Sequence, residues 1–311
     1  MVTLGETMAL LRAVSVGSLA QVSDLELGIG GAESNLAIAL TRLGTAVTWL
    51  GRVGDDSLGE RIVRELRAEG LDVRAIRDPE APTGLMIKES RIPDATQVFY
   101  YRRGSAGSAL TVADVDTVDI ASSALVHVTG ITSALSDSAA DAVAHAVELA
   151  AASAVPVSFD VNHRSRLWGG RDAASRYRAI ASEATLVFAG ADEARLLAPE
   201  AETPEALART IAALGPRHVV IKLGAEGAYA LVDGVEYRRA AVPIRVVDSV
   251  GAGDGFVAGY LAEYLRGLSV EESLSTAVKT GAFACLHPGD WEGYPRRAEF
   301  GLLEASEPVT R

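Results

Sequence analysis

The chain has 311 residues, and 49% of them are apolar, which is enough to bury a sizeable core. Acidic residues outnumber basic residues by 41 to 29, and the resulting formal charge of −12 disfavours partners such as nucleic acid or an anionic membrane surface. The single cysteine, Cys285, rules out an intrachain disulfide and is predicted to be a buried, inert thiol. Because no leader and no long apolar run are evident, we expect a cytoplasmic protein.

Short apolar segments alternate with helical patterns along most of the chain. The predicted strands are residues 2–4, 46–53, 125–129, 155–160, 185–189 and 218–223. The predicted helices are residues 32–43, 57–69, 136–152, 172–182, 204–214, 253–265 and 270–286. This alternation predicts βαβ units and a mostly parallel sheet with helices on both faces, in a single domain spanning residues 1–311.

Two segments, at roughly 8–29 and 83–104, interrupt this alternation. The second contains two β-rich runs, 84–89 and 96–101, on either side of turn-forming residues at 92–95. It therefore predicts a β-hairpin. We expect the two insertions to form a small sheet that acts as a lid over the main domain. A further antiparallel region is expected over 224–247, and its last five residues are expected to form an apolar strand.

The strongest motif is the string Asp-Ser-Val-Gly-Ala-Gly-Asp-Gly-Phe at positions 248–256, between an apolar segment and a helical pattern. A glycine-rich turn that enters a helix has backbone amides without partners, and together with the helix dipole they form an anion site. Gly251, Ala252 and Gly253 are therefore candidate ligands of a phosphoryl group, and Asp254 is placed to accept a proton from a nearby hydroxyl. The alternative is an ordinary aspartate at a helix N-terminus.

This string resembles the C-terminal signature of the ribokinase-like (PfkB) carbohydrate kinases. The same resemblance extends to Gly-Gly-Ala-Glu-Ser-Asn at 30–35 and to Gly-Arg-Val-Gly-Asp-Asp-Ser-Leu-Gly at 51–59, and it covers essentially the whole chain. It implies a three-layer α/β/α domain with a mostly parallel central sheet and a small β-sheet lid. It also implies Mg-ATP as phosphoryl donor, a sugar hydroxyl as acceptor and Asp254 as catalytic base.

Three further segments narrow the acceptor. They are Phe-Tyr-Tyr-Arg-Arg-Gly-Ser-Ala at 99–106, Asp-Val-Asn-His-Arg-Ser-Arg-Leu-Trp at 160–168 and Pro-Gly-Asp-Trp at 288–291. Strand alternation places Tyr100 and Arg102 on one face, and it predicts that Asp160, Asn162 and Arg164 project together. The segments resemble the branch of the family that phosphorylates 2-keto-3-deoxygluconate. The substrate contacts that this resemblance implies are Gly31, Asn35, Tyr100, Arg102, Arg164, Asp254 and Asp290.

The acceptor of that branch carries a carboxylate, which a chain of charge −12 must capture with a few well-placed cations. Arginine suits this purpose because its planar guanidinium can bind a carboxylate through two hydrogen bonds. Arg102 and Arg164 are the candidates. A solvated edge strand with protective cations is the alternative for the first of them.

On the nucleotide side, the segment Lys-Leu-Gly-Ala-Glu-Gly at 222–227 resembles the strand and glycine turn of the family near the ATP phosphates. The implied ATP contacts are Asn162, Lys222, Gly224, Gly227, Gly251, Ala252 and Gly253. Glu193 matches the family's glutamate that organises Mg²⁺ through water, although Gly190 stands where the family has asparagine. A monovalent-cation site is also compatible with the family, but no residue in the sequence identifies it.

Several alternatives stay open at this level. The same chemistry on fructose, ribose, a nucleoside or the galacto epimer of the ketodeoxy acid fits the main motifs, and a catalytically silent sugar-binding regulatory protein fits the scaffold. The expected partners are a sugar acid, ATP and a second copy of the chain, because an exposed edge of a lid sheet often pairs with a partner.

Overall fold

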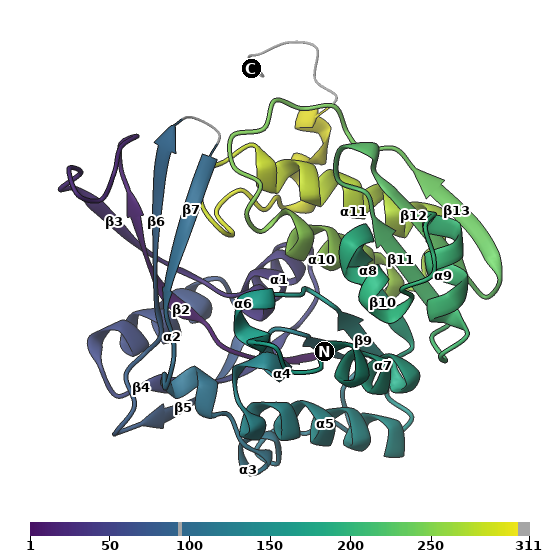
Figure 1. The fold of residues 1–311 in the computed structure, drawn as a ribbon, viewed down its shortest axis with the longest axis horizontal. Coiled ribbons are helices and arrows are strands. Elements are labelled where there is room, and N and C mark those ends of the chain that lie inside the picture. The colour runs from purple at the N-terminus through teal and green to yellow at the C-terminus, as the bar shows by residue number, and fades with distance from the viewer. Residues whose placement is uncertain (93–94, 304–311) are drawn as a thin grey trace.

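The computed structural model describes residues 1–92 and 95–303, and within them a nine-stranded sheet forms the centre of the molecule (Figure 1). Neighbouring strands of this sheet run parallel except at one edge, where β12 is antiparallel to both of its neighbours, β11 and β13. In spatial order the strands are β13 (Val235–Arg239), β12 (Ala228–Val232), β11 (His218–Lys222), β10 (Leu186–Gly190), β9 (Val157–Asp160), β8 (Val126–Thr129), β1 (Val2–Leu4), β4 (Thr48–Gly54) and β5 (Asp72–Asp78).

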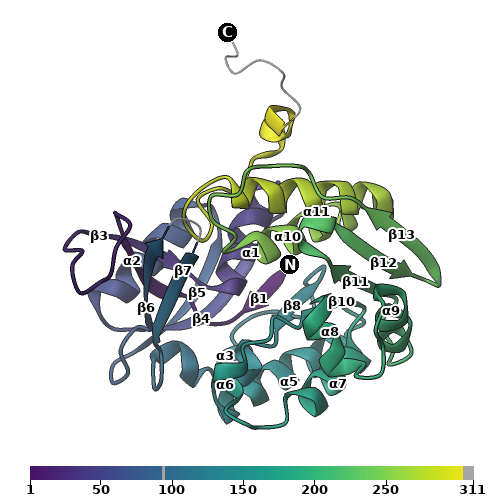
Figure 2. The same cartoon turned by 45° about the horizontal axis from the view of Figure 1, so that its top comes forward.

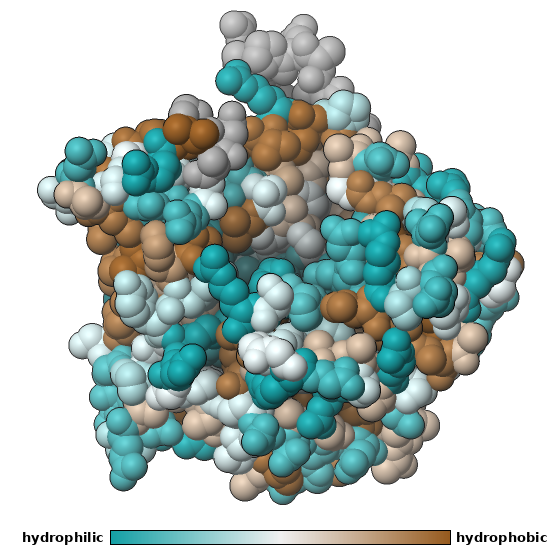
Figure 3. All heavy atoms as spheres, in the orientation of Figure 1, coloured by the Kyte–Doolittle hydropathy of each residue, from teal (hydrophilic) through white to brown (hydrophobic). Residues whose placement is uncertain are grey.

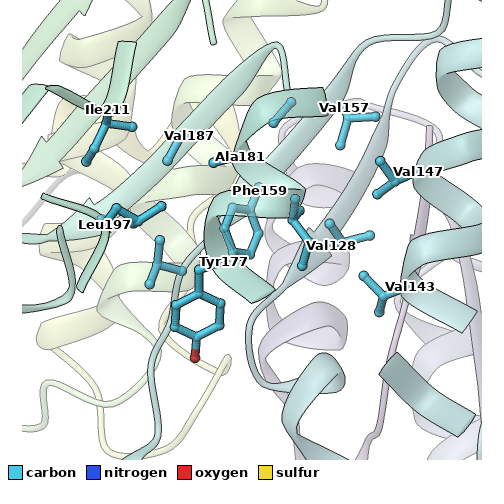
Figure 4. Close-up of a cluster of buried hydrophobic side chains, with 14 of the residues drawn as sticks. Val128, Val143, Val147, Val157, Phe159, Tyr177, Ala181, Val187, Leu197 and Ile211 are labelled. Atoms are coloured by element: carbon cyan, nitrogen blue, oxygen red, sulfur yellow. The ribbon is translucent and has the colours of Figure 1, made fainter. Parts of the chain in front are cut away.

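Helices cover both faces of this sheet and create two separate apolar cores. One core is built on the face covered by α5 (Asp137–Ala152), α7 (Ala173–Glu183), α8 (Ala191–Leu197) and α9 (Pro204–Ala212), as the close-up in Figure 4 shows. The other lies against α1 (Ala32–Arg42), α2 (Ser57–Ala68), α10 (Ala252–Tyr264) and α11 (Val270–Cys285). The three-layer α/β/α arrangement predicted for the chain is therefore confirmed.

Short helical segments complete the described chain. They are α3 (Val112–Val115), α4 (Thr132–Leu135), α6 (Ser165–Trp168), η1 (Ala106–Ala109), η2 (Gly224–Glu226) and η3 (Arg297–Leu303). Local sequence chemistry explains several helix starts. Asp56, for example, precedes α2 and accepts a hydrogen bond from the Gly59 amide at 2.8 Å, which satisfies one unpaired amide of the first turn.

A second sheet of four strands stands apart from the central one and is formed by the two segments that interrupt the βα alternation (Figures 1 and 2). Its order is β3 (Leu25–Gly30), β2 (Met8–Ala13), β6 (Leu85–Ile92) and β7 (Ala95–Tyr101). β6 and β7 form the predicted antiparallel hairpin. Residues 93 and 94 of its expected turn lie outside the described residues. We call this four-stranded sheet the lid sheet.

The structure corrects two expectations and adds one strand that the sequence did not predict. Residues 243–247 form no strand, because the Val247 amide donates to the Cys285 carbonyl at 2.8 Å instead of pairing with a sheet neighbour. β5 was not predicted, because it is a half-exposed edge strand whose four charged residues conceal its apolar side. Cys285 is half-buried and not fully buried.

Three strands of the central sheet end side by side and define where the site lies. Asp160 ends β9, Gly190 ends β10 and Lys222 ends β11, and the register pairs Gly190 with Lys222. Ligands of open α/β sheets bind beyond the carboxyl ends of the strands. Among the residues that the structure describes, no helix is both long and apolar enough to cross a bilayer.

Candidate active site

A cavity of about 990 Å³ opens between the lid sheet and the carboxyl ends of the central strands. Its walls come from β2, β6 and β7 on the lid side, and from α1, α10 and the segments after β9 and β10 on the other side. Figure 3 shows this face of the molecule hollowed between the two parts. The volume lies at the upper end of the usual range for small-molecule sites, so it suits two reactants better than one small ligand.

Asp254 lies at this cavity in the first turn of α10, with one amide donor on each carboxylate oxygen. The side-chain amide of Asn35, from α1, donates to Oδ2 at 2.9 Å, and that of Asn162, after β9, donates to Oδ1 at 3.3 Å. Loss of hydration raises the pKa of Asp254 to about 7, against the opposing effect of the Asn35 hydrogen bond. The group can therefore take up and release a proton near neutral pH.

The turn before Asp254 requires glycine. Gly251 precedes α10 with a φ of 78°, and a Cβ there would lie 2.0 Å from the Asp290 carbonyl oxygen. The Tyr294 hydroxyl donates to the Gly251 carbonyl at 2.8 Å and also lies next to the place where this Cβ would stand. Gly253 lines the cavity, whereas the amide of Ala252 donates to the Ser249 carbonyl at 3.3 Å. The start of α10 therefore places a helix N-terminus, the kind of feature that favours anions, at the cavity wall.

Lys222 supplies positive charge next to this turn. Its Nζ donates to both carboxylate oxygens of Asp160, at 2.8 and 3.0 Å, and it lies 3.6 Å from the place where a Cβ on Gly253 would stand. Burial acts to lower the pKa of Lys222, but the carboxylates of Asp160, Glu193 and Asp254 together more than offset this and hold that pKa above its ordinary value. The ammonium group therefore stays charged at the cavity wall beside Gly253.

Glu193 borders the cavity from the first turn of α8. Its Oε1 accepts from the His163 amide at 2.9 Å and its Oε2 from the Gly190 amide at 2.6 Å. Within the described residues no group of three or more His, Cys, Asp or Glu side chains could enclose a metal ion. One fixed carboxylate facing a wide polar cavity fits Mg²⁺ held mainly by phosphates and water, which is the usual arrangement for this ion.

The opposite end of the cavity is bordered by a buried ion pair between the lid sheet and the main body. Arg102 follows β7, and its Nε donates to Glu6 Oε2 at 2.7 Å, while Ser105 also donates to Glu6. The Arg102 guanidinium lies 5.9 Å from the centre of the Tyr100 ring. Tyr100 and Arg102 both line the cavity and Tyr101 does not, as strand alternation predicts, but Arg103 lines it as well, because the strand ends at Tyr101 and the alternation does not continue beyond it.

A second buried ion pair crosses the same gap, and sequence reasoning missed one of its members. Lys88 of β6 donates to Asp290, and both side chains are almost fully buried, at 2% and 5% exposure. Lys88 shares the inward face of its strand with Met86, so a charged residue at an apolar position was the available signal. Burial raises the pKa of Asp290, and Lys88 opposes that effect.

Arg164 differs from these two cations. It borders the cavity and is exposed, and its guanidinium donates a hydrogen bond to the His163 carbonyl at 3.2 Å. It has no carboxylate partner among the residues that the structure describes, and its charge lowers the pKa of Asp254. It is therefore a cation that is available to an acidic ligand.

Most of the predicted site residues meet at this one cavity. They are Gly31, Asn35, Tyr100, Arg102, Asn162, Arg164, Glu193, Lys222, Gly251, Gly253, Asp254 and Asp290. Ala252, Gly224 and Gly227 do not line it, and their expected contact with ATP stays a prediction. Gly227 has a structural reason to be glycine, since its φ is 101° and a Cβ would lie 2.0 Å from the Arg239 carbonyl oxygen.

The expectation that Asp160 projects together with Asn162 and Arg164 is wrong. Asp160 turns to Lys222 and is absent from the cavity wall. The reason is local, because Asn162 has a φ of 35° and the extended alternation ends there.

Comparisons with known proteins agree with this geometry. The family model described as pfkB family carbohydrate kinase matches residues 1–297. A protein named 2-dehydro-3-deoxygluconokinase from Bacillus subtilis (strain 168) is 40% identical, with 99% of this chain and 96% of that protein covered. A protein named 2-dehydro-3-deoxygalactonokinase from Haloferax volcanii is 32% identical, with 93% of this chain and 92% of that protein covered. A structure from E. coli, described as a candidate ribokinase II in complex with ATP and Mg²⁺, superimposes with a TM-score of 0.89 at 25% identity, covering 97% and 98%.

The variant Lys88→Met tests whether the second ion pair supports the site. Methionine keeps an unbranched side chain of nearly the same length, but it leaves the Asp290 carboxylate buried without its cation. Breaking a buried pair in this way typically costs about 3–5 kcal/mol. We expect urea unfolding to detect a loss of that size and the KM of the ligand bound at this end to rise roughly tenfold or more.

The double variant Lys88→Met, Asp290→Asn is the matched control. It removes both charges, so most of the lost unfolding free energy should return while the KM defect remains. If Lys88→Met alone left both quantities at their wild-type values, the ion pair would have no role in the site.

Proposed function

Because this chain belongs to the pfkB family of carbohydrate kinases, we propose that it transfers the γ-phosphoryl group of ATP to the 6-hydroxyl of 2-keto-3-deoxygluconate, also called 2-dehydro-3-deoxygluconate. The observation that carries this proposal is the position of Asp254. A carboxylate with a pKa of about 7 stands in the first turn of a helix whose N-terminal amides and neighbouring Lys222 form an anion site. A base beside a phosphate site is what phosphoryl transfer to an alcohol requires.

The proposed step is a displacement at the γ-phosphorus of ATP. The 6-hydroxyl oxygen forms a bond to the γ-phosphorus while the bond from that phosphorus to the β,γ-bridging oxygen breaks. The hydroxyl proton passes to the Asp254 carboxylate, and ADP leaves with the bonding electrons. Gly251 and Gly253, with the dipole of α10, stabilise the negative charge on the transferring group. Lys222 stays protonated and adds to this stabilisation.

Several cations that line the cavity support an acidic acceptor, and they are Lys88, Arg102, Arg103, Arg164 and Arg166. The charges of Arg102 and Lys88 are already balanced by buried carboxylates, so both serve mainly to hold Glu6 and Asp290 in place as acceptors for sugar hydroxyls. Arg164 has no such partner within the described residues and is the stronger candidate for the substrate carboxylate. A net charge of −12 makes this local concentration of cations necessary.

ATP fits the side of the cavity near α10 and β11, and the E. coli neighbour of 25% identity is described with ATP and Mg²⁺. We place the phosphates at Lys222 and the glycine turn, and we assign Glu193 to the water shell of Mg²⁺. When bound, the ion neutralises charge on the phosphates. Closure of the lid sheet over both reactants would exclude water, which otherwise hydrolyses ATP.

A second acceptor has specific support. The Haloferax volcanii relative is named for the galacto epimer, and the two acids differ at one hydroxyl. The higher identity, 40% against 32%, favours the gluco acid. The homo-oligomer and the cytoplasmic location expected from the sequence stay predictions, and so does the monovalent-cation site.

Asp254→Asn removes the base and keeps the shape of the side chain. We expect kcat to fall by about 10²–10⁴-fold, because general-base assistance is worth that much. KM for ATP and for the acid should change little. A coupled ADP-release assay on a panel of the two ketodeoxy acids, fructose, ribose and a nucleoside measures this and also ranks the acceptors. Near-normal turnover by Asp254→Asn would refute the assignment, and wild-type activity confined to a neutral sugar would refute the proposed acceptor.

The pH profile should report the raised pKa of Asp254. The ionised form is the base, so activity is lost as pH falls through a pKa of about 7. We expect kcat/KM for the acid to drop roughly tenfold per pH unit below pH 7 and to level off above it. An acidic limb near pH 4, the ordinary range of an aspartate, would contradict the environment described for this group.

Arg102→Ala tests recognition of the acid. We expect KM for the acid to rise at least about tenfold. The charge-assisted hydrogen bond from Arg102 to Glu6 is lost, so Glu6 is no longer held in place as an acceptor for a sugar hydroxyl. KM for ATP should stay near its wild-type value. Arg91→Ala is the control, since Arg91 belongs to the same hairpin but is exposed and lies away from the cavity. An unchanged acid KM in Arg102→Ala would exclude Arg102 from recognition.

A further inference from the structure

Asn162 has a backbone conformation that is rare for a residue with a side chain. It follows β9 with a φ of 35°, in the left-handed region. In the part of the chain that the structure describes, only Ala154 and Asp233 are other non-glycine residues with positive φ. Asparagine tolerates this region better than most residues, but the conformation still costs free energy, so the surroundings must impose it.

Hydrogen bonds on both sides of Asn162 impose this conformation. The preceding amide, of Val161, donates to the Phe188 carbonyl in β10 at 2.9 Å. The following amide, of His163, donates to Glu193 in α8 at 2.9 Å. The peptide is therefore attached to two different elements, and between these attachments the chain turns and directs the Asn162 side chain to Asp254.

The side chain of Asn162 is 5% exposed and makes one hydrogen bond to a described residue, from its amide to Asp254 Oδ1 at 3.3 Å. Asn35 makes the opposite contact, to Oδ2 at 2.9 Å, and its own Oδ1 accepts from the Gly31 amide at 3.4 Å. Asp254 is thus held at both oxygens by donors from two elements that are far apart in the sequence. Each oxygen keeps a lone pair for another partner.

We propose that Asn162 is a positioning residue for the catalytic base: its strained backbone aims an amide at Asp254 Oδ1, so that the carboxylate is held between two fixed donors. This inference rests on the proposed role of Asp254 as the base. It differs from the nucleotide contact that family resemblance implies for Asn162. An amide that holds the base acts on kcat and on the base's ionisation, whereas one that binds ATP acts on the KM for ATP.

Two donors on a carboxylate have two physical effects. They limit its rotation, and errors of about 1 Å in reactant placement can cost about 10²-fold in rate. They also favour the ionised form, so loss of either donor makes the base harder to ionise. The charged or titratable groups around Asp254 are Asp160 at the end of β9, Arg164 before α6, Lys222 in β11 and Tyr294 after α11. None of these changes when Asn162 is replaced.

Asn162→Gly is the main test, because glycine accepts a positive φ without strain and lacks the amide. With the acceptor that the wild type uses best, we expect kcat to fall roughly 10–100-fold. The acidic limb of kcat/KM should move to higher pH, and KM for ATP should stay within about twofold, since no phosphate contact is removed.

Two further variants separate backbone from side chain. Ala154→Gly relieves a φ of 55° at the end of α5, away from the cavity, and should leave all kinetic constants unchanged. Asn162→Asp keeps the shape and the tolerance for positive φ, but it replaces the donor with a second carboxylate. It should move the acidic limb further than Asn162→Gly does. It also preserves a test if the glycine variant folds poorly.

The outcomes are distinguishable. A shifted limb and a lowered kcat with an unchanged ATP KM support the proposal. A raised KM for ATP with no shift in the acidic limb of the pH profile would assign Asn162 to nucleotide binding and overturn the proposal. Wild-type kinetics in both Asn162 variants would overturn it as well. Normal turnover by Asp254→Asn is a different failure, because it removes the base itself and with it the premise.

Discussion

The proposed function depends on one electrostatic constraint, which is that a carboxylate must stay ionisable beside the place assigned to the phosphates of ATP. Asp254 would be repelled by that charge if the dipole of α10 and the Lys222 ammonium did not offset it. Burial pulls in the other direction and raises the pKa of Asp254 to about 7. The balance of these effects gives a group that is basic enough to take a proton and ionised often enough to do so near neutral pH.

This constraint explains why the glycine turn is so closely supported. Gly251 packs against the Asp290 carbonyl and accepts a hydrogen bond from the Tyr294 hydroxyl, and a Cβ on this residue would collide with the carbonyl. Residues from the last part of the chain therefore fix the start of α10, and Asp290 also reaches the lid through Lys88. The segment around Asp290 therefore contacts both the start of α10 and the lid sheet, on two sides of the cavity.

The lid sheet is joined to the body by charge, and not by apolar contacts alone. The pairs Arg102–Glu6 and Lys88–Asp290 are buried in the wall of the cavity. Buried ion pairs add little net stability relative to apolar residues of the same size, because desolvation offsets their attraction. Their value here is geometric. They hold two carboxylates at defined positions, whereas Arg103, Arg164 and Arg166 border the cavity without a carboxylate partner among the described residues.

The sequence by itself determined the layers and the main chemistry of this protein. Helix and strand periodicity, and the turn at 248–256, are local signals, so the three-layer fold, the hairpin of β6 and β7 and the position of Asp254 at the start of a helix could all be predicted from short segments. Strand alternation also placed Tyr100 and Arg102 correctly on the cavity side. Contacts between residues far apart in the sequence could not be predicted from these local patterns. Only the tertiary structure decided that Lys88 meets Asp290, 202 positions away, that Asp160 turns to Lys222, and that Asn162 leaves the extended conformation to reach Asp254. The physical reason is that these contacts join separate elements, and no local pattern of residues records which elements the fold brings together.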